Sequence, residues 1–381
     1  MKSNLKYVTY QSFPSLKANT IQTIDNVNYL SKYYNVEVIF PLREKDSTDN
    51  KSVLENYYHI NEKITFSGIS HRYPFGKFNY FNKLSFVISH FMWSKKYIKK
   101  ISKTNKDTFF TRSDWIFYFL SLKNMNVTFE CHQLSRIRKF VMRKSIINPN
   151  SKIIFLNTNL LLDSKIDQTK YKEKLIVLHN GVDYKLFSKN VKKDKNQIIF
   201  VGNLKRFNES RNLEFFISAF NNPDMPDNLS FTVIGHPEEE IKKLETFVIE
   251  NNLEKKIKIL DRLQRESAIA QIQKSSIGLL INTDDNSHSI RYTSPLKYFE
   301  YLYAGLKIVA VNFPSHHDLP FSENIIFYEL SDDKSFINAL IKAFNVESPN
   351  NKNIEVITLE YRAKEIFNFR LFSLFIFRII W

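Results

Sequence analysis

A carboxylate and an ammonium group lie three residues apart in the stretch Ser294-Pro295-Leu296-Lys297-Tyr298-Phe299-Glu300. Residues with this spacing share one side of a helix, so Lys297 and Glu300 would face a ligand together. An ammonium group can pair with a phosphate, and a carboxylate can accept hydrogen bonds from neighbouring sugar hydroxyls. The pair therefore indicates a site for a phosphate-bearing sugar, although a surface helix with one charge pair has the same pattern.

The helix that must carry this pair is marked at both ends. Pro295 is suited to the first helical position, with Thr293 or Ser294 as the cap. Gly305 is the usual left-handed residue after a helix, and a short β-branched strand follows at 308–311. The first N–H groups of such a helix, including that of Leu296, can bind a phosphate.

Similar strands and helices alternate along the whole chain, which predicts parallel α/β sheets. Its 381 residues exceed one ordinary core and fit two domains. The predicted strands cover residues 6–10, 36–40, 107–112, 127–130, 152–157, 175–178, 197–204, 229–235, 257–260, 277–281 and 308–311.

The stretch from Ser294 to Gly305, followed by a Val-rich strand, resembles the donor-site motif of retaining glycosyltransferases of family 4. That family has the GT-B fold, in which two Rossmann-like domains face each other across a cleft and a C-terminal helix returns to the first domain. The resemblance implies an acceptor-binding domain at 1–182 and a nucleotide-sugar domain at 183–348. Residues 349–381 would then pack on the first domain or on a membrane.

The resemblance also assigns roles to single residues of the second domain. Glu300 would bind the ribose, whereas Ser294, the Leu296 N–H and Lys297 would bind the diphosphate. A second cation would come from Arg206 or Arg211, because Asn203 stands where many members have Arg. Tyr292 stands where the commonest form of the motif has a second Glu. The remaining positions expected to line the nucleotide are Gly202, Asn203, Gly235, Arg262 and Leu263.

In the first domain, the sequence Glu130-Cys131-His132 resembles the Glu-x-His that ends a strand in this family. There the His lines the cleft near the transferred sugar and the leaving diphosphate. A neutral His can hydrogen-bond a hydroxyl and a charged one an oxyanion. His132 is therefore predicted to be catalytic, together with Lys297 and Arg211, although a lone His is more often a packed or surface residue.

The formal net charge is +16, and residues 1–190 carry the whole excess of Lys and Arg. A basic half indicates an anionic partner, such as acidic lipid, nucleic acid or an anionic glycan. Cys131 is the only cysteine, which fits a reducing compartment. With neither a signal peptide nor an apolar run of membrane length in the sequence, we expect a cytoplasmic protein.

Residues 71–106 interleave aromatic residues with lysines, including Lys95, Lys96, Lys99 and Lys100. This pattern predicts a basic amphipathic helix at an anionic membrane surface, and 136–144 would extend it. A core helix with a solvated lysine face is the alternative. Nucleic acid is not expected, because no recognition signature accompanies the charge. The apolar tail at 369–381 could contact the membrane or pack on the first domain.

We expect no metal and no cofactor beyond the nucleotide sugar as co-substrate. Asp284 and Asp285 are adjacent and would point apart, and the stretch 316–318 lacks a third ligand at metal-site spacing. The helix dipole and fixed cations can stabilise a departing diphosphate without a divalent ion.

The sequence therefore predicts a retaining, metal-independent glycosyltransferase that moves a sugar from a nucleotide sugar to a glycan or lipid-linked glycan. Its setting would be cell-surface polysaccharide biosynthesis, with peripheral attachment to the inner face of the cell membrane. The alternatives are a nucleotide-sugar epimerase of the same fold and a non-catalytic basic binding protein for membrane or nucleic acid. The sequence does not identify the base, the sugar, the acceptor or the oligomeric state.

Overall fold

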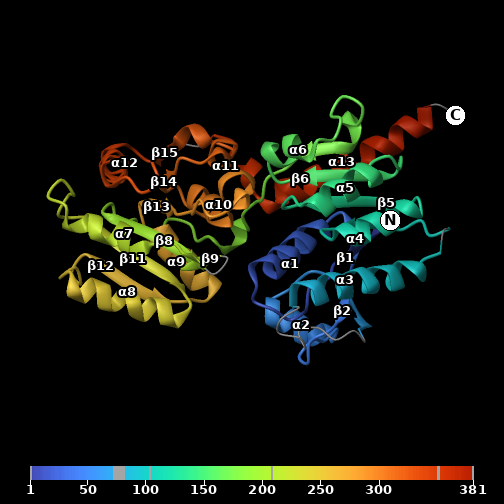
Figure 1. Ribbon diagram of the computed structural model, residues 1–381, viewed down its shortest axis with the longest axis horizontal. Helices are drawn as coiled ribbons and strands as arrows, with labels where there is room; N and C mark the ends of the chain where they lie inside the picture. The colour runs from blue at the N-terminus through green and yellow to red at the C-terminus, as the bar shows by residue number, and fades with distance from the viewer. Residues whose placement is uncertain (1, 72–81, 103, 207–208, 350–351, 380–381) are drawn as a thin grey trace. The chain divides into compact units, whose positions relative to one another are not determined.

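A computed structural model of the 381-residue chain describes residues 2–71, 82–102, 104–206, 209–349 and 352–379 (Figure 1). The chain divides into two compact units. Unit 1 consists of Met1–Leu178 and Leu359–Trp381, and unit 2 consists of His179–Thr358.

Unit 1 is built on a parallel sheet of seven strands in the order β3-β2-β1-β4-β5-β6-β7. Strands β1 and β4 are adjacent, so the chain reverses its direction of winding between them. The strands are β1 Ser3–Val8, β2 Tyr34–Leu42, β3 Ile64–Ser70, β4 Thr108–Thr111, β5 Asn126–Cys131, β6 Ser151–Phe155 and β7 Leu175–Val177.

The helices of unit 1 cover both faces of this sheet. Right-handed crossovers place helices on opposite faces on the two sides of the reversal. Helix α1 packs with α13, whereas α3, α4 and α5 pack side by side in a second layer. The helices are α1 Ala18–Leu30, α2 Lys51–Tyr58, α3 Asn82–Lys99, α4 Asp114–Leu122, α5 Arg136–Ser145, α6 Thr158–Ser164 and α13 Leu359–Ile379.

Helix α13 is held on unit 1 by two buried arginines. Arg362 donates from Nη2 to Glu130 Oε2 at 2.8 Å, and neither side chain is more than 2% exposed. Arg370 donates to the Phe109 carbonyl at 3.0 Å and to Thr128 Oγ1 at 2.6 Å. Burial lowers the pKa of Arg370 to about 10. The start of the apolar tail therefore packs on unit 1, and the side chains from 372 onward lie outside the described residues.

Unit 2 is built on a second parallel sheet, of six strands in the order β12-β11-β8-β13-β14-β15. A short antiparallel pair, β9 Lys205–Arg206 and β10 Glu209–Ser210, follows β8. The six strands are β8 Gln197–Asn203, β11 Ser230–His236, β12 Ile257–Asp261, β13 Ile277–Leu280, β14 Lys307–Val311 and β15 Ile325–Tyr328.

Both sheets are parallel and covered by helices, so the predicted α/β class with two Rossmann-like domains is confirmed. No helix in the described ranges is both long enough and apolar enough to cross a membrane. The helices of unit 2 are α7 Leu213–Ser218, α8 Glu238–Glu250, α9 Arg265–Lys274, α10 Leu296–Tyr303, α11 Pro314–His317 and α12 Asp333–Asn345.

The buried pair between Glu130 and Arg362 generates a prediction about stability. Arg362→Ala leaves an uncompensated carboxylate in the interior, so the free energy of unfolding should fall by about 3–5 kcal/mol. Because neighbouring cations lower the pKa of Glu130, the stability that the pair contributes should be lost as the pH falls below its unfolded-state value of about 4.3. Urea unfolding at several pH values measures both effects.

Glu360→Ala is the matched control, since it breaks an ion pair on the same helix. Glu360 pairs with Lys32, and their side chains are 42% and 32% exposed. Its removal should cost no more than about 1 kcal/mol. Equal losses in the two variants would contradict a special role for the buried pair.

Candidate functional site

The predicted nucleotide-binding residues of unit 2 gather at the carboxyl ends of its central strands. Gly202 in β8 lies directly opposite Gly235 in β11. A Cβ atom added to Gly235 would lie 2.8 Å from the Gly202 carbonyl oxygen and 2.6 Å from the Leu204 side chain. The exposed Asn203 ends β8 beside them. Glycine is therefore required where the two strand ends approach this closely.

Arg211 is the cation that extends over the carboxyl ends of these strands. Its Nη1 donates to the carbonyl of Ile281, just beyond β13, and its guanidinium lies 5.7 Å from the centre of the Phe200 ring. The side chain thus bridges the ends of two adjacent strands, β8 and β13. Ligands of parallel α/β sheets bind outside such strand ends.

Lys205 is directed elsewhere, although it is close to Arg211 in sequence. Its ammonium group pairs with Glu239 at 2.6 Å and with Glu240 at 2.9 Å, both in helix α8. Arg206 ends β9, and its side chain lies outside the described residues. Among the described side chains, Arg211 is therefore the candidate for the second cation that would bind the diphosphate, besides Lys297.

Helix α10 starts one residue later than predicted. Pro295 is its N-cap, rather than its first helical residue, and no side chain caps the helix. The predicted caps were wrong because both side chains have tertiary partners. Thr293 donates to Ser315 Oγ at 3.2 Å, and Ser294 Oγ accepts from the backbone N–H of Asn180 at 3.1 Å. Gly305 ends the helix with a φ of +71°, as predicted.

Asn180 fastens the start of unit 2 to the start of helix α10. Besides its backbone contact, its side-chain amide donates to the Ser294 carbonyl at 2.5 Å. An Asn-Gly pair is typical of a tight turn with positive φ, but neither Asn180 nor Gly181 is among the described residues with positive φ. The sequence did not indicate this contact between Asn180 and Ser294, because the two residues are 114 positions apart.

A second contact fixes the body of α10 against the sheet. The backbone N–H of Val201 donates to Tyr301 Oη at 3.0 Å. A Cβ on Gly278 would lie 2.4 Å from the Tyr301 ring, so only glycine lets the helix come this close to β13. A glycine inside a strand was the available sequence signal for this approach.

Lys297 and Glu300 meet on α10 as their spacing predicts. Lys297 Nζ lies 2.5 Å from Glu300 Oε2, with Glu300 nearly buried and Lys297 about one-third exposed. A diphosphate could take the ammonium group and a ribose the carboxylate, because both are polar contacts that a ligand can exchange. The N–H groups of Leu296 and Lys297 face outward from the first turn, as at any helix start.

Arg262 and Leu263 follow β12 directly, at the same edge of the sheet. Burial lowers the pKa of His236 at the end of β11, and the charge of Arg262 adds to this effect. Arg262 is exposed and Leu263 is half-buried. These two residues, which were expected to line the nucleotide, therefore lie at the end of the strand next to that of Gly235.

Sequence reasoning missed a buried polar cluster that supports this edge. Asn282 donates to the Ser289 carbonyl at 3.4 Å and contacts His316 Nε2 at 3.3 Å, while His316 Nδ1 contacts the Val311 carbonyl at 2.8 Å. Ser289 belongs to a π-helical turn, His288–Tyr292, immediately before the α10 motif. Such turns occur often at functional sites.

In unit 1, both ring nitrogens of His132 have partners. Arg112 Nη2 donates to Nδ1 at 2.9 Å, and Nε2 contacts Glu130 Oε1. Burial and the charge of Arg112 lower the pKa of His132 to about 3. Burial alone would raise the pKa of Glu130, but Arg362, His132 and Arg112 hold it well below its usual range. His132 is therefore neutral at physiological pH, and its catalytic role stays a prediction.

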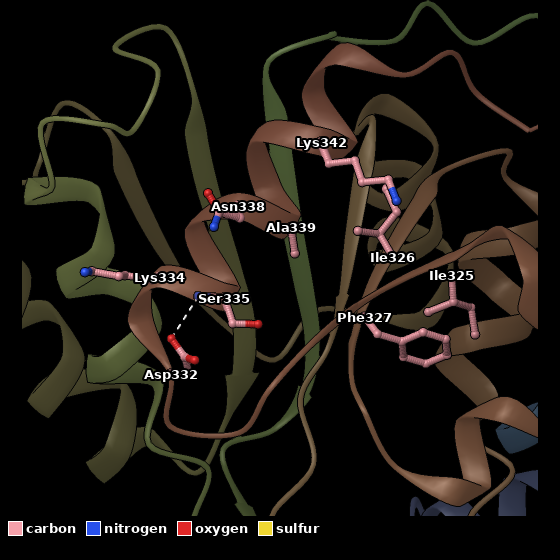
Figure 2. A pocket seen from close by; sticks show the side chains of 9 residues that line it. All are labelled: Ile325, Ile326, Phe327, Asp332, Lys334, Ser335, Asn338, Ala339 and Lys342. Carbon is pink, nitrogen blue, oxygen red and sulfur yellow. Dashed lines mark hydrogen bonds between the residues drawn. The ribbon is translucent and has the colours of Figure 1, made fainter.

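Unit 2 could also bind a ligand at a metal site or in a separate pocket. The described residues contain no group of three or more His, Cys, Asp or Glu side chains placed to hold a metal ion. Figure 2 shows a pocket between the edge strand β15 and helix α12. Its Asp332 caps α12 by accepting from the Ser335 N–H. None of the predicted site residues lines this pocket.

The comparisons with known proteins agree with this geometry. The sequence model of the family described as Glycosyl transferases group 1 matches residues 195–345. This range covers most of unit 2, His179–Thr358. The strand ends, Arg211 and helix α10 described above all lie within the matched range. No curated protein sequence matches the chain.

Three solved structures show the fold of the whole chain. That of Anabaena Alr3699/HepE in complex with UDP has a TM-score of 0.59 at 12% identity, covering 99% of this chain and 98% of its own. The structure of sucrose-phosphate synthase from Thermosynechococcus elongatus has a TM-score of 0.60 at 13% identity, and the match covers 100% of this chain and 98% of that one. The structure of WaaG, a glycosyltransferase involved in lipopolysaccharide biosynthesis, has a TM-score of 0.54 at 10% identity, and the match covers 96% of this chain and 95% of that one. The fold is therefore GT-B.

Glu300 provides the first test of the site. If its carboxylate accepts hydrogen bonds from ribose hydroxyls, Glu300→Ala should weaken binding of a nucleoside diphosphate by about 1–3 kcal/mol. Calorimetry with UDP measures this loss. Glu250→Ala, at an exposed position near the end of α8, is the control and should bind UDP like the wild type. Unchanged affinity in a folded Glu300→Ala protein would reject the assignment.

His132 provides a second test, through pH. Its pKa of about 3 lies below the working range, so its imidazole should stay neutral from pH 5 to pH 9. The pH profile of kcat/KM should therefore keep its shape in His132→Asn, although its height can fall because Arg112 loses its support. An acidic limb near pH 6.5 that disappears in this variant would show that His132 titrates during turnover.

Proposed function

We propose that the protein transfers a sugar from a nucleoside-diphosphate donor to a glycan or lipid-linked glycan acceptor. The observation that carries this proposal is that Arg211 and the first turn of α10, with Lys297, both lie at the carboxyl end of the unit 2 sheet, within the range that the glycosyltransferase model matches. A site with two cations and a helix N-terminus fits a diphosphate. Glu300 beside them fits the ribose.

The same residues account for the chemical step. The bond between the sugar C1 and the β-phosphate oxygen breaks, and negative charge develops on the departing diphosphate. Arg211 and Lys297 would stabilise this charge, together with the α10 N–H groups, without a divalent ion. The acceptor hydroxyl forms the new bond to C1 and passes its proton to an oxygen of the departing diphosphate. Retention of configuration is part of the proposal and follows from the family resemblance of the α10 motif.

A uridine nucleotide is the donor that we would try first. The HepE structures contain UDP, or UDP with glucose, and WaaG acts in lipopolysaccharide biosynthesis. These likenesses support a role in cell-surface polysaccharide biosynthesis. We also include in the proposal a location at the inner face of the cell membrane, supported by the basic first half of the chain.

A panel of nucleotide sugars in a thermal-shift assay tests the proposal, followed by transfer assays with the best donor. Arg211→Gln should raise the Kd for that donor by roughly tenfold or more, because a charge-assisted contact to phosphate is lost. Turnover should be insensitive to EDTA. Stabilisation by no nucleotide sugar would contradict the proposed function. Turnover that EDTA abolishes and magnesium restores would contradict the metal-free diphosphate site.

Lys205→Gln is the matched control, since it removes a cation from the same loop. Lys205 pairs with Glu239 and Glu240, so its loss should leave donor affinity within about twofold of the wild type. If Lys205→Gln weakens donor binding as much as Arg211→Gln does, the second cation has been misassigned. Conversion of the donor without an acceptor would instead indicate an epimerase.

A further inference from the structure

Helices α3, α4 and α5 of unit 1 form a continuous outer layer joined by aromatic rings. Phe91 of α3 lies 4.9 Å from Trp115 and 5.4 Å from Phe119, both in α4, measured between ring centres. Trp115 and Tyr118 are only half-buried. Helix α5 packs against the other side of α4. The three helices therefore present one surface rather than three separate ones.

Large apolar side chains are exposed on this layer. On α3, Leu84 and Ile88 are 54% and 53% exposed, and on α5, Ile137 and Phe140 are 47% and 49% exposed. Leu122, at the end of α4, is 66% exposed. A cluster of this kind on a folded protein marks a contact with a partner or a membrane. The further exposed members are Val87, Met92 and Ile147.

Cations flank these apolar residues and acids are almost lacking. Neither α3 nor α5 contains Asp or Glu. The only acid in α4 is Asp114, which is mostly buried and lies 3.5 Å from Arg138. The exposed cations are Lys95, Lys96, Lys99, Lys100, Arg136, Arg143 and Lys144. The surface therefore complements a partner that is negatively charged and apolar beneath its charges.

Helical geometry places both kinds of residue on the same side. On α3, residues 84, 87, 88, 92, 95, 96 and 99 fall within one side of the helix, opposite the buried Trp93. On α5, the exposed residues 136, 137, 140, 143 and 144 likewise share one side, opposite Val141 and Met142. Apolar positions surrounded by cations, with Trp and Tyr between them, are typical of helices at a bilayer interface.

We propose that the outer surface of α3, α4 and α5 binds an anionic lipid bilayer, with the apolar residues entering the headgroup region and the cations contacting lipid phosphates. This inference deepens the proposed function by naming the surface on which a lipid-linked acceptor is met. It rests on that function only for the nature of the acceptor. Nucleic acid fits less well, because exposed aliphatic residues such as Leu84 and Ile88 have no role against a phosphate backbone.

The first experiment measures sedimentation with vesicles of phosphatidylcholine alone and of phosphatidylcholine with about one-third phosphatidylglycerol. Binding should require the anionic lipid and fall as salt is raised. The triple change Lys95→Gln, Lys96→Gln and Lys99→Gln should weaken binding by roughly tenfold or more. The matched control removes three exposed lysines elsewhere on unit 1, at Lys165, Lys170 and Lys172, and should bind like the wild type.

The second experiment tests the apolar contact separately from the charge. Ile137→Ser with Phe140→Ser should weaken vesicle binding while leaving UDP affinity unchanged. Brominated lipids should quench tryptophan fluorescence in the wild type and in Trp381→Phe, but much less in Trp115→Phe. UDP binding, measured without vesicles, reports on the proposed function independently, so the two proposals can fail separately.

Three results would overturn this inference. One is equal binding of the α3 variant and its lysine control. Another is quenching that is lost in Trp381→Phe and kept in Trp115→Phe, which would assign the contact to the C-terminal tail. The third is binding of an RNA oligonucleotide that depends on the α3 lysines when anionic vesicles do not bind at all.

Discussion

A carboxylate and a guanidinium group that water hardly reaches join two distant parts of unit 1. Glu130 ends the β5 strand of the central sheet, and Arg362 comes from helix α13, 232 residues later. Losing one partner of such a pair is costly, whereas replacing both by apolar residues can be neutral. We infer that its main contribution is specificity, since α13 can bury Arg362 only in the one position that meets Glu130.

Glu130 of that pair also contacts His132 at the end of β5. Burial and the charge of Arg112 lower the pKa of His132 by more than the carboxylate raises it, so His132 stays neutral. The resemblance of the Glu-x-His sequence to a family motif indicated a residue that acts on the substrate. The described contacts of His132 are to Arg112 and Glu130, and its action on the substrate stays a prediction.

Sequence reasoning found every interior strand of both sheets and missed one edge strand of each. Central strands such as 152–157 and 197–204 are continuous apolar runs because helices cover both faces. The strands of the two sheets that it missed are the edge strands β3 and β15, whereas the other two edge strands, β7 and β12, were predicted. The caps of α10 were misassigned because Thr293 and Ser294 bond to Ser315 and Asn180, which are remote in sequence. Local propensity carries no information about such partners.

In the candidate site too, some contacts could be predicted from the sequence and others could not. The pairing of Lys297 with Glu300 follows from helical spacing and was predictable. The different fates of Lys205 and Arg211 were not, because acids on α8 neutralise one and a carbonyl beyond β13 orients the other. Which of two neighbouring cations serves a ligand thus depends on elements that the fold brings together.

The discontinuity of unit 1 affects the order in which the protein can fold during translation. The seven strands of its sheet are synthesised first, and all of unit 2 follows before Arg362 leaves the ribosome. Until then Glu130 has no guanidinium from α13, and α1 lacks the helix that packs against it. Unit 2 is contiguous and can reach its native state alone. The nascent chain therefore carries a complete second unit beside a first unit that still lacks its last helix.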